Sequence, residues 1–183
     1  MGVFLGWMPD AAAQAALANL RDRLRAALPA DAPRHDWRLP AQWHATLRYL
    51  GDSLPPGQRE RLEAAMPTLA ATPARSAGLA GAQYWPHARV LVARIQATDA
   101  LKALLASLEA GAQACGFARE RAQTPHVTLA YLPRGAQPPA LTDAVGAIAA
   151  TPLRIDRIDL LQTAPGGYRT LASWPLQTPP TDA

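Results

Sequence analysis

Two short phrases of the sequence repeat the residue types that can do acid and base chemistry. HATLRYLG begins at His44 and HVTLAYLP begins at His126, and the two share their His, Thr, Leu, Tyr and second Leu in the same order. Each histidine is followed two residues later by a threonine, Thr46 in the first phrase and Thr128 in the second. Because the chain of 183 residues has only 4 histidines, this repeated pairing indicates that both phrases contribute to one site.

Substitution at phosphorus is the chemistry that fits this pattern. A base must act on the entering oxygen and an acid on the leaving oxygen, on opposite sides of the phosphorus. Imidazole can do either at neutral pH, and threonine hydroxyls can donate to the non-bridging oxygens. The alternatives are two structural histidines or a metal site. The metal site would need a third ligand, and no His-x-x-x-His or His-Glu spacing occurs.

Both phrases are predicted to form β-strands, in which successive side chains point to opposite faces. The alternation predicts that His44, Thr46 and Arg48 share one face of the first strand. Arg48 is therefore predicted to be a further phosphate ligand, since its guanidinium matches a phosphate group. Tyr49, and Tyr131 at the matching position of the second strand, are predicted to pack in the core.

The remaining pattern predicts the elements that position these strands. The segment RIDLLQTAPGGYRTLASW indicates a hairpin, so the sheets are expected to be largely antiparallel. We predict an α+β fold for 1–183 as a single bilobal domain: two related lobes, two mostly antiparallel sheets flanking a central cleft, and helices on the outside. Helices are predicted at 11–28, 56–66, 99–115 and 140–149, and strands at 3–7, 43–51, 77–84, 89–95, 125–132, 153–162 and 168–176.

Composition narrows the class of protein. Hydrophobic residues make up 49% and charged residues 17%, as expected for a folded globular chain. The single cysteine, Cys115, excludes an internal disulfide and is predicted to be a buried apolar filler. No apolar run approaches the length of about 18 residues that crosses a bilayer, and the first residues do not resemble a signal peptide. We therefore expect a cytoplasmic protein with no membrane partner, acting as a monomer.

Charge leaves the type of ligand open. The net charge is +4, and Lys102 is the only lysine among 18 basic residues. Arginine suits an anionic substrate or a nucleic acid, but a biased genome composition explains the same balance. Among other candidates, His35 and His87 are predicted at the surface, and Trp43 is predicted to stack on a base, act as a lid or pack in the core. Arg169 follows a Gly-Gly turn from which it could reach the cleft.

HATL at 44–47 and HVTL at 126–129 resemble the two signature motifs of the two-histidine phosphoesterase superfamily. From about 3 to 176 the chain is similar to the RNA 2′,3′-cyclic phosphodiesterases, also called bacterial 2′-5′ RNA ligases. Several relatives carry a basic residue where this chain has Ala130 and Tyr131, and Arg48 is predicted to supply that charge instead.

This resemblance implies opening of a 2′,3′-cyclic phosphate to a 2′-phosphomonoester without metal or cofactor. The partners it implies are RNA or nucleotides with 2′,3′-cyclic phosphate ends. It implies that His44 donates a proton to the departing 3′-oxygen and that His126 accepts one from water. Thr46 and Thr128 would hold the phosphate.

Two other functions remain open at this point. The same residues would catalyse the reverse reaction, 2′-5′ joining of RNA ends, and a protein that kept the cleft without turnover would be a nucleotide or RNA-end binding module. The residues themselves do not fix which histidine is the acid and which is the base.

Overall fold

The computed structural model describes residues 2–120, 124–142, 146–147 and 151–177. The predicted succession of helices and strands is confirmed with small shifts of their ends, except that the single strand predicted at 153–162 is two strands, Pro152–Ile155 and Arg157–Ala164, which pair with different neighbours. Half of the helix predicted at 140–149 falls outside the described residues. A short strand and a 3-10 turn lie within the stretch 29–42 that was predicted to be loop. In chain order the elements are β1 (Val3–Trp7), α1 (Ala11–Ala26), β2 (Asp36–Trp37), η1 (Pro40–Gln42), β3 (Ala45–Gly51), α2 (Pro56–Ala70), β4 (Arg75–Trp85), β5 (Val90–Gln96), α3 (Asp99–Ala114), β6 (His126–Tyr131), β7 (Pro152–Ile155), β8 (Arg157–Ala164) and β9 (Gly167–Pro175).

Local sequence signals set the ends of the two longest helices. The Asp10 side chain accepts a hydrogen bond of 2.8 Å from the Ala13 N–H and so caps α1. Thr98 caps α3 in the same way through the Leu101 N–H, at 3.2 Å. Gly116 follows α3 with a φ of 93°, which a residue without a side chain adopts at little cost. Each helix therefore begins and ends where its capping residues place it.

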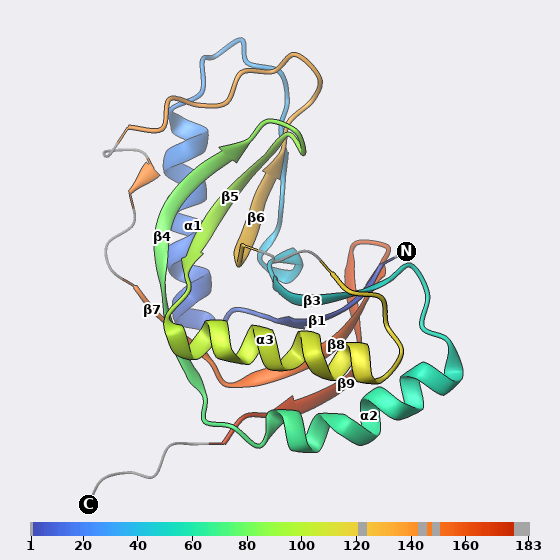
Figure 1. Cartoon of the computed structure of the whole chain (residues 1–183). Helices are drawn as coiled ribbons and strands as arrows, with labels where there is room; N and C mark the ends of the chain where they lie inside the picture. The colour runs from blue at the N-terminus through green and yellow to red at the C-terminus, as the bar shows by residue number, and fades with distance from the viewer. Residues whose placement is uncertain (1, 121–123, 143–145, 148–150, 178–183) are drawn as a thin grey trace, which may run out of the picture.

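Every strand pair in the described residues is antiparallel except one isolated bridge at the edge. The strands form one sheet in the order β7-β4-β5-β6-β3-β1-β8-β9, with β2 paired to β6. The α+β class is confirmed, but the prediction of two sheets is wrong, because β3 and β6 pair with each other. That pairing consists of one register pair, Ala45 with Val127. Figure 1 shows the two halves of the sheet turning away from each other at this junction.

The helices cover the sheet in two groups. α2 and α3 pack against each other, and they contact β9 and β3 respectively. In Figure 1 they lie in front of the half formed by β1, β3, β8 and β9, while α1 lies behind β4 and β5. Buried side chains from both groups join a single large hydrophobic cluster, which holds the two halves of the sheet as one body. No helix in the described residues is long and apolar enough to cross a membrane.

A β-bulge interrupts β3 immediately after its threonine. Against β1, Thr46 pairs with Gly6, but the next pair is Arg48 with Leu5, so Leu47 is left without a partner in this register. An extra residue of this kind resets the alternation of faces along the strand. The burial pattern changes at the same place: Leu47 and Arg48 are both buried, although they are neighbours in a strand.

β6 carries a bulge at the matching position. Against β5, Thr128 pairs with Val92, but the next pair is Ala130 with Leu91, so Leu129 is left without a partner in this register. Leu129 and Ala130 are both buried, as are their counterparts in β3. The two motif strands therefore share a backbone irregularity as well as a sequence.

Candidate active site

The pairing of β3 with β6 brings the two histidine and threonine pairs together. Ala45 lies opposite Val127, and continuing this register by one residue sets His44 opposite Thr128 and His126 opposite Thr46. Side chains directly opposite each other in an antiparallel pair project from the same face, with Cβ atoms roughly 5 Å apart. All four side chains are half-buried. They form a small polar group at the point where the two halves of the sheet meet.

His44 is held by its backbone neighbour and by two aromatic rings. Its Nδ1 lies 3.3 Å from the carbonyl oxygen of Gln42, which can only accept, so Nδ1 carries the proton in this contact. The ring centroid is 4.9 Å from that of Phe4 and 4.3 Å from that of Tyr168. The orientation of the ring is thereby fixed, and Nε2 is the nitrogen that remains to act on a substrate.

His126 repeats this arrangement. Its Nδ1 lies 2.8 Å from the carbonyl oxygen of Thr124, also two residues earlier in the chain. Within the described residues a single aromatic ring packs on it, that of Trp85, with centroids 4.4 Å apart. The two imidazoles therefore present the same nitrogen, Nε2, in the same tautomer.

Burial sets the charge state of both rings. It lowers the pKa of His44 from 6.5 to about 4; the hydrogen bond to Gln42 opposes the shift, while the nearby charges of His126 and Arg38 add to it. Burial also lowers the pKa of His126, again opposed by its backbone hydrogen bond. Both rings are therefore neutral at pH 7 in the free protein. An anion bound between them would favour the protonated forms.

Arg38 belongs to the site, although the sequence did not reveal it. Its backbone N–H donates to the carbonyl of Leu129, at 2.8 Å, and so aligns it beside β6. Its guanidinium hydrogen-bonds Tyr168, which contacts His44, and lies 5.6 Å from the ring centroid of Tyr131. The sequence pattern could not reveal Arg38, because β2, the strand that precedes it, is only 2 residues long and shows no periodicity.

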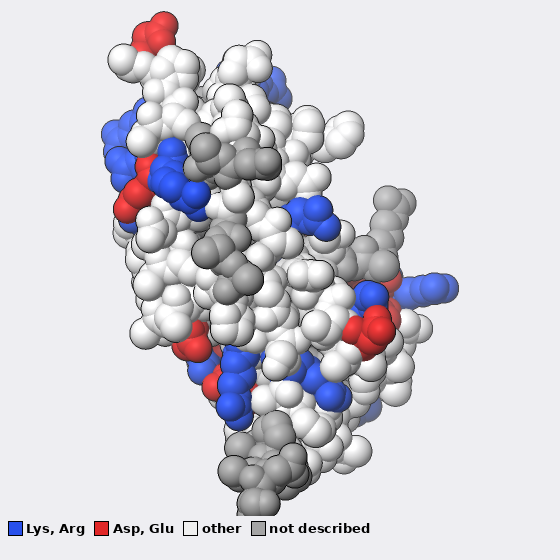
Figure 2. Space-filling view, turned by 90° about the vertical axis from the view of Figure 1, so that its left-hand side faces the viewer, with Lys and Arg blue, Asp and Glu red and all other residues white. Residues whose placement is uncertain are grey.

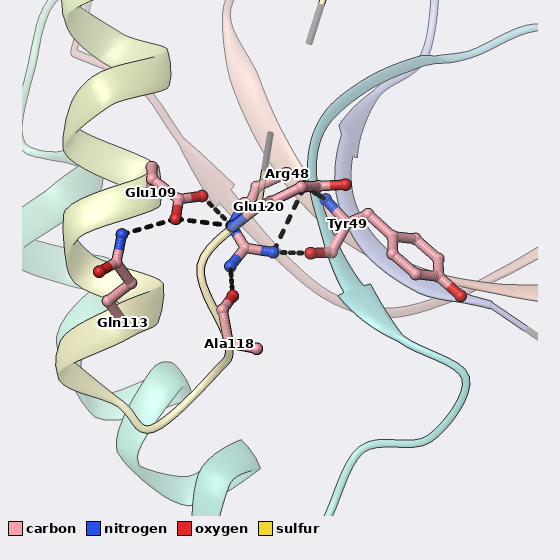
Figure 3. Close-up of polar contacts among 6 residues, drawn as sticks. All are labelled: Arg48, Tyr49, Glu109, Gln113, Ala118 and Glu120. Carbon is pink, nitrogen blue, oxygen red and sulfur yellow. Dashed lines mark hydrogen bonds and ion pairs between the residues drawn. The ribbon is translucent and has the colours of Figure 1, made fainter. Parts of the chain in front are cut away.

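Arg48 does not lie with the histidines. Only 4% of it is exposed, and it forms ion pairs with Glu109 and Glu120, the latter at 3.3 Å. It also donates to the carbonyl oxygens of Tyr49 and Ala118 (Figure 3). The prediction that Arg48 shares the face of His44 is wrong, because the bulge in β3 turns its side chain to the opposite face, toward α3. Arg48 is therefore not available as a phosphate ligand.

The bulges also overturn the prediction for the two tyrosines. Tyr131 is 46% exposed rather than packed in the core, and Arg38 stacks on it. Tyr49 is half-buried, and its hydroxyl donates to Asp52 at 2.7 Å. Simple alternation assigned both to the wrong face.

Five other residues were singled out from the sequence. His35 is only 4% exposed, so the prediction that it lies at the surface is wrong, whereas His87 is exposed as predicted. Trp43 is completely buried, which selects the core among its three predicted roles. Cys115 is buried as predicted. Arg169 is exposed and donates to Gln162 on the neighbouring strand at 2.5 Å.

Metal ligands are not grouped in the part of the chain that the structure describes: no three His, Cys, Asp or Glu side chains lie together there. The acid and base groups at the junction are the two imidazoles. Arg38 places positive charge near His44, and Arg94 lies opposite His126 in the pairing of β5 with β6. This arrangement can hold a small anion and move protons on two sides of it.

Comparison with known proteins agrees with this geometry. TT0787 of Thermus thermophilus matches with a TM-score of 0.76 and 23% identity, over 97% of this chain and 99% of that chain. LigT of Escherichia coli, solved in complex with NADP⁺, matches with a TM-score of 0.66 and 20% identity, over 96% of this chain and 97% of that chain. These likenesses show a shared fold. No curated protein sequence matches the chain.

A family model identifies the chain more directly. The model of the 2′-5′ RNA ligase superfamily matches residues 42–167, which is more than half of the chain and contains both histidine motifs. The resemblance inferred from HATL and HVTL is confirmed at this level. The chain belongs to the 2′-5′ RNA ligase superfamily of two-histidine phosphoesterases.

Proposed function

We propose that the protein is an RNA 2′,3′-cyclic phosphodiesterase that opens terminal cyclic phosphates to 2′-phosphomonoesters. The observation that carries the proposal is the pair of imidazoles at the β3–β6 junction, each fixed through Nδ1 and each keeping Nε2 for a substrate. LigT of Escherichia coli has been solved in complex with 3′-AMP, ATP and NADP⁺, which are nucleotides, and this supports a nucleotide substrate for the present chain.

In the proposed mechanism His126 acts as the base. Its Nε2 takes a proton from water, and the water oxygen attacks the phosphorus of the cyclic phosphate. The bond from phosphorus to the 3′-oxygen breaks, and protonated His44 gives its Nε2 proton to that oxygen. Hydroxyls of Thr46 and Thr128 donate to the non-bridging oxygens, where charge concentrates in the transition state. The product keeps the phosphate on the 2′-oxygen.

Arg38 supplies positive charge in this proposal. In the free protein burial keeps His44 neutral by lowering its pKa, and the charge of Arg38 contributes a smaller part of that shift. When a cyclic phosphate binds, its negative charge offsets that of Arg38 and stabilises the imidazolium of His44. Substrate binding therefore prepares the acid, and Arg38 takes the place that Arg48 was predicted to fill.

We also propose that the chain is one domain built from two copies of a smaller lobe. The repeated phrases, the bulges at Leu47 and Leu129, and the shared hydrogen bond from Nδ1 to the carbonyl two residues earlier support this origin. Because the two strands are so similar, the assignment of His44 as the acid follows the family resemblance rather than the geometry.

The test is to replace each histidine singly and measure hydrolysis of 2′,3′-cyclic CMP. We expect His44→Ala and His126→Ala each to lower turnover by about 10² to 10⁴, since a positioned acid or base contributes that much. His87→Ala is the matched control, because His87 is exposed on the β4–β5 turn. Circular dichroism spectra equal to that of the wild type would show that the fold is kept. Wild-type turnover in either variant would contradict the proposal.

Joining of RNA ends through a 2′-5′ bond is the second candidate, favoured by the family description. The same groups serve both directions, but water at about 55 M favours hydrolysis by mass action. Incubating a cyclic-phosphate RNA with a 5′-hydroxyl RNA, and comparing joined with hydrolysed product, decides between them. A binding module without catalysis would instead retain the product tightly and show no turnover even with protein in excess.

A further inference from the structure

A basic hollow lies beside the proposed active site, between the end of α1 and the loop that leads to β2. Its volume is about 760 Å³, which is the size of a site for a sizeable ligand. Figure 2 shows basic side chains gathered toward the upper left of the face it displays, with a few acidic ones among them. The residues of the hollow that matter here are Arg21, Arg25, Arg34, His35, Trp37 and Arg38.

Positive charge prevails in the hollow. Among the described residues its only lining carboxylate is Asp36, which is exposed and pairs with Arg38 at 3.4 Å. Arg21 pairs with Asp22, which is also exposed, and surface pairs of this kind neutralise little. Arg25 and Arg34 have no carboxylate at ion-pair distance in the part of the chain that the structure describes. An anion that enters the hollow would therefore contact the guanidinium groups of Arg25 and Arg34, which form no ion pair with a described carboxylate.

The base of the hollow is built from buried and stacked rings. The guanidinium carbon of Arg25 lies 6.0 Å from the ring centroid of Trp37, and His35 stacks on that ring with centroids 5.9 Å apart. His35 is 4% exposed, and its Nδ1 lies 2.7 Å from the Pro33 carbonyl. Its Nε2 has no hydrogen-bond partner among the described residues, which costs stability in the free protein. The exposed Arg25 guanidinium therefore lies over the Trp37 ring at the edge of the hollow, where a ligand can reach it.

One set of contacts, through Arg38, joins the hollow to the histidines. Arg38 lines the hollow and also hydrogen-bonds Tyr168, whose ring contacts His44. Arg21 also lines the hollow and lies over the ring of Trp43, at 5.6 Å from its centroid, but Trp43 is completely buried and, as the extended neighbour of His44, points away from the imidazole. A ligand that holds its terminal phosphate between the imidazoles therefore continues past Arg38 into the hollow. Arg21 and Arg25 are four residues apart in α1, about 6 Å along the axis, and can meet successive phosphates.

We infer that the hollow is a subsite for the phosphodiester backbone of the RNA that precedes the terminal cyclic phosphate. This inference rests on the proposed function. A cyclic mononucleotide would contact only the histidines and their neighbours, whereas an oligonucleotide would also place its preceding phosphates beside Arg25 and Arg34. Single-stranded RNA, rather than a free cyclic nucleotide, is then the preferred substrate.

Binding measured without turnover is the first test. We use a fluorescently labelled RNA of ten nucleotides that ends in a 2′-phosphate, and follow its anisotropy as salt is varied. The double variant Arg25→Ala/Arg34→Ala is expected to raise Kd about tenfold. It should also make the slope of log K against log salt shallower by about 1.4, or about 0.7 for each phosphate contact that is lost.

Two further double variants serve as controls. Arg119→Ala/Arg154→Ala removes the same charge at exposed positions outside the hollow and is expected to leave Kd and the slope near those of the wild type. Arg25→Lys/Arg34→Lys keeps the charge and is expected to retain most of the affinity. If Arg25→Ala/Arg34→Ala had the same Kd and the same salt slope as Arg119→Ala/Arg154→Ala, the inference would be overturned.

Kinetics form the second test. For the wild type, kcat/KM is expected to be higher for the oligonucleotide with a cyclic phosphate end than for 2′,3′-cyclic CMP. In Arg25→Ala/Arg34→Ala the ratio of the two values is expected to fall about tenfold; an equal loss for both substrates would contradict a subsite. If neither substrate turns over, the proposed function fails, while the anisotropy test still decides the subsite. If the wild type bound ATP more tightly than RNA, and Arg25→Ala/Arg34→Ala lost that ATP binding, the hollow would be a site for free nucleotides. That result would refute the inference.

Discussion

At the scale of residues, each histidine is held through Nδ1, which leaves Nε2 to face a substrate. A carbonyl two residues earlier accepts from Nδ1 in both cases, so the strand that carries the histidine also orients it. His44 and Thr46 could be found from the sequence, because a histidine two residues before a threonine, written twice, is informative in itself. Arg38 could not, since its approach to Tyr168 depends on how the loop from α1 folds over β6. The two histidines could thus be predicted from residue type, whereas the position of Arg38 near His44 became visible only in the tertiary structure.

The lowered pKa values predict an acidic optimum for capture of the substrate. One imidazole must carry a proton and the other must not, and burial lowers the pKa of both below 6.5 in the free protein. We therefore expect kcat/KM to be highest below pH 6.5 and to fall as the pH rises, because neither free ring then holds the proton. The bound anion favours the imidazolium, so kcat should reach its maximum at a higher pH. Profiles of both parameters between pH 4 and 8 check this, and a kcat/KM optimum above pH 7 would contradict it.

The same shift makes the fold sensitive to acid. The folded-state pKa of His44 is about 4 and lies below the unfolded value of 6.5, so the unfolded state binds more protons between these limits. The stability contributed by neutral His44 is present above pH 6.5 and is lost as the pH falls toward 4. Between pH 7 and 4.5 we expect His44→Gln to lose about 2 kcal/mol less unfolding free energy than the wild type.

Urea unfolding at the two pH values measures this difference. His87→Gln is the control, since His87 is exposed and should show the acid sensitivity of the wild type. Equal losses in His44→Gln and the wild type would show that His44 is not protonated more readily in the unfolded state.

At the scale of elements, the bulges mark the limit of what the sequence predicts. The caps of α1 and α3, the hairpin of β8 and β9, and the order of helices and strands follow from local patterns. Alternation holds from His44 to Thr46 and from His126 to Thr128, where each site residue lies before the bulge. One unpaired leucine then reverses the faces, which is why Arg48 was assigned to the wrong side. Nothing in the leucine itself marks the bulge, because it arises from the register of the neighbouring strand.

The new position of Arg48 gives it a structural role between elements. It joins β3 to Glu109 of α3 and to Glu120, which precedes β6 and also accepts from the Tyr49 N–H at 2.9 Å. The pKa of Glu109 is lowered: partial burial raises it, but hydrogen bonds from Glu120 and Gln113 and the charge of Arg48 outweigh that effect. The charge of Arg48 therefore compensates two carboxylates (Figure 3).

Removing Arg48 should leave these carboxylates without their cation. We expect Arg48→Ala to lower the unfolding free energy by about 3 kcal/mol, since breaking a buried ion pair from one side is costly. The control is Arg59→Ala, which breaks the exposed pair of Arg59 and Glu63 at 2.8 Å within α2 and should cost about 0.5 kcal/mol. Urea unfolding of both variants at pH 7 gives the comparison. A loss for Arg48→Ala as small as for Arg59→Ala would show that the buried network contributes nothing specific.

At the scale of the whole molecule, two similar strands, β3 and β6, meet in surroundings that differ. The strands that carry the histidines share their bulges and their hydrogen bonds. Their neighbours do not match: Phe4 and Tyr168 pack on His44, while Trp85 packs on His126. Arg38, which lines the basic hollow, adjoins the His44 side through Tyr168. A symmetric pair of strands therefore lies in an asymmetric pocket, and a substrate has two distinct ends to recognise.

This asymmetry should make cleavage of the cyclic phosphate regiospecific. If the surroundings orient the cyclic phosphate, His44 always faces the same ester oxygen, and 2′,3′-cyclic CMP should yield a single phosphomonoester. With His44 as the acid toward the 3′-oxygen, that product is the 2′-phosphate, which ³¹P NMR distinguishes from the 3′-phosphate. A pure 3′-phosphate would reverse the two histidine roles while keeping the oriented pocket. A mixture of both products would mean that the repeated strands, rather than the residues around them, govern how the substrate binds.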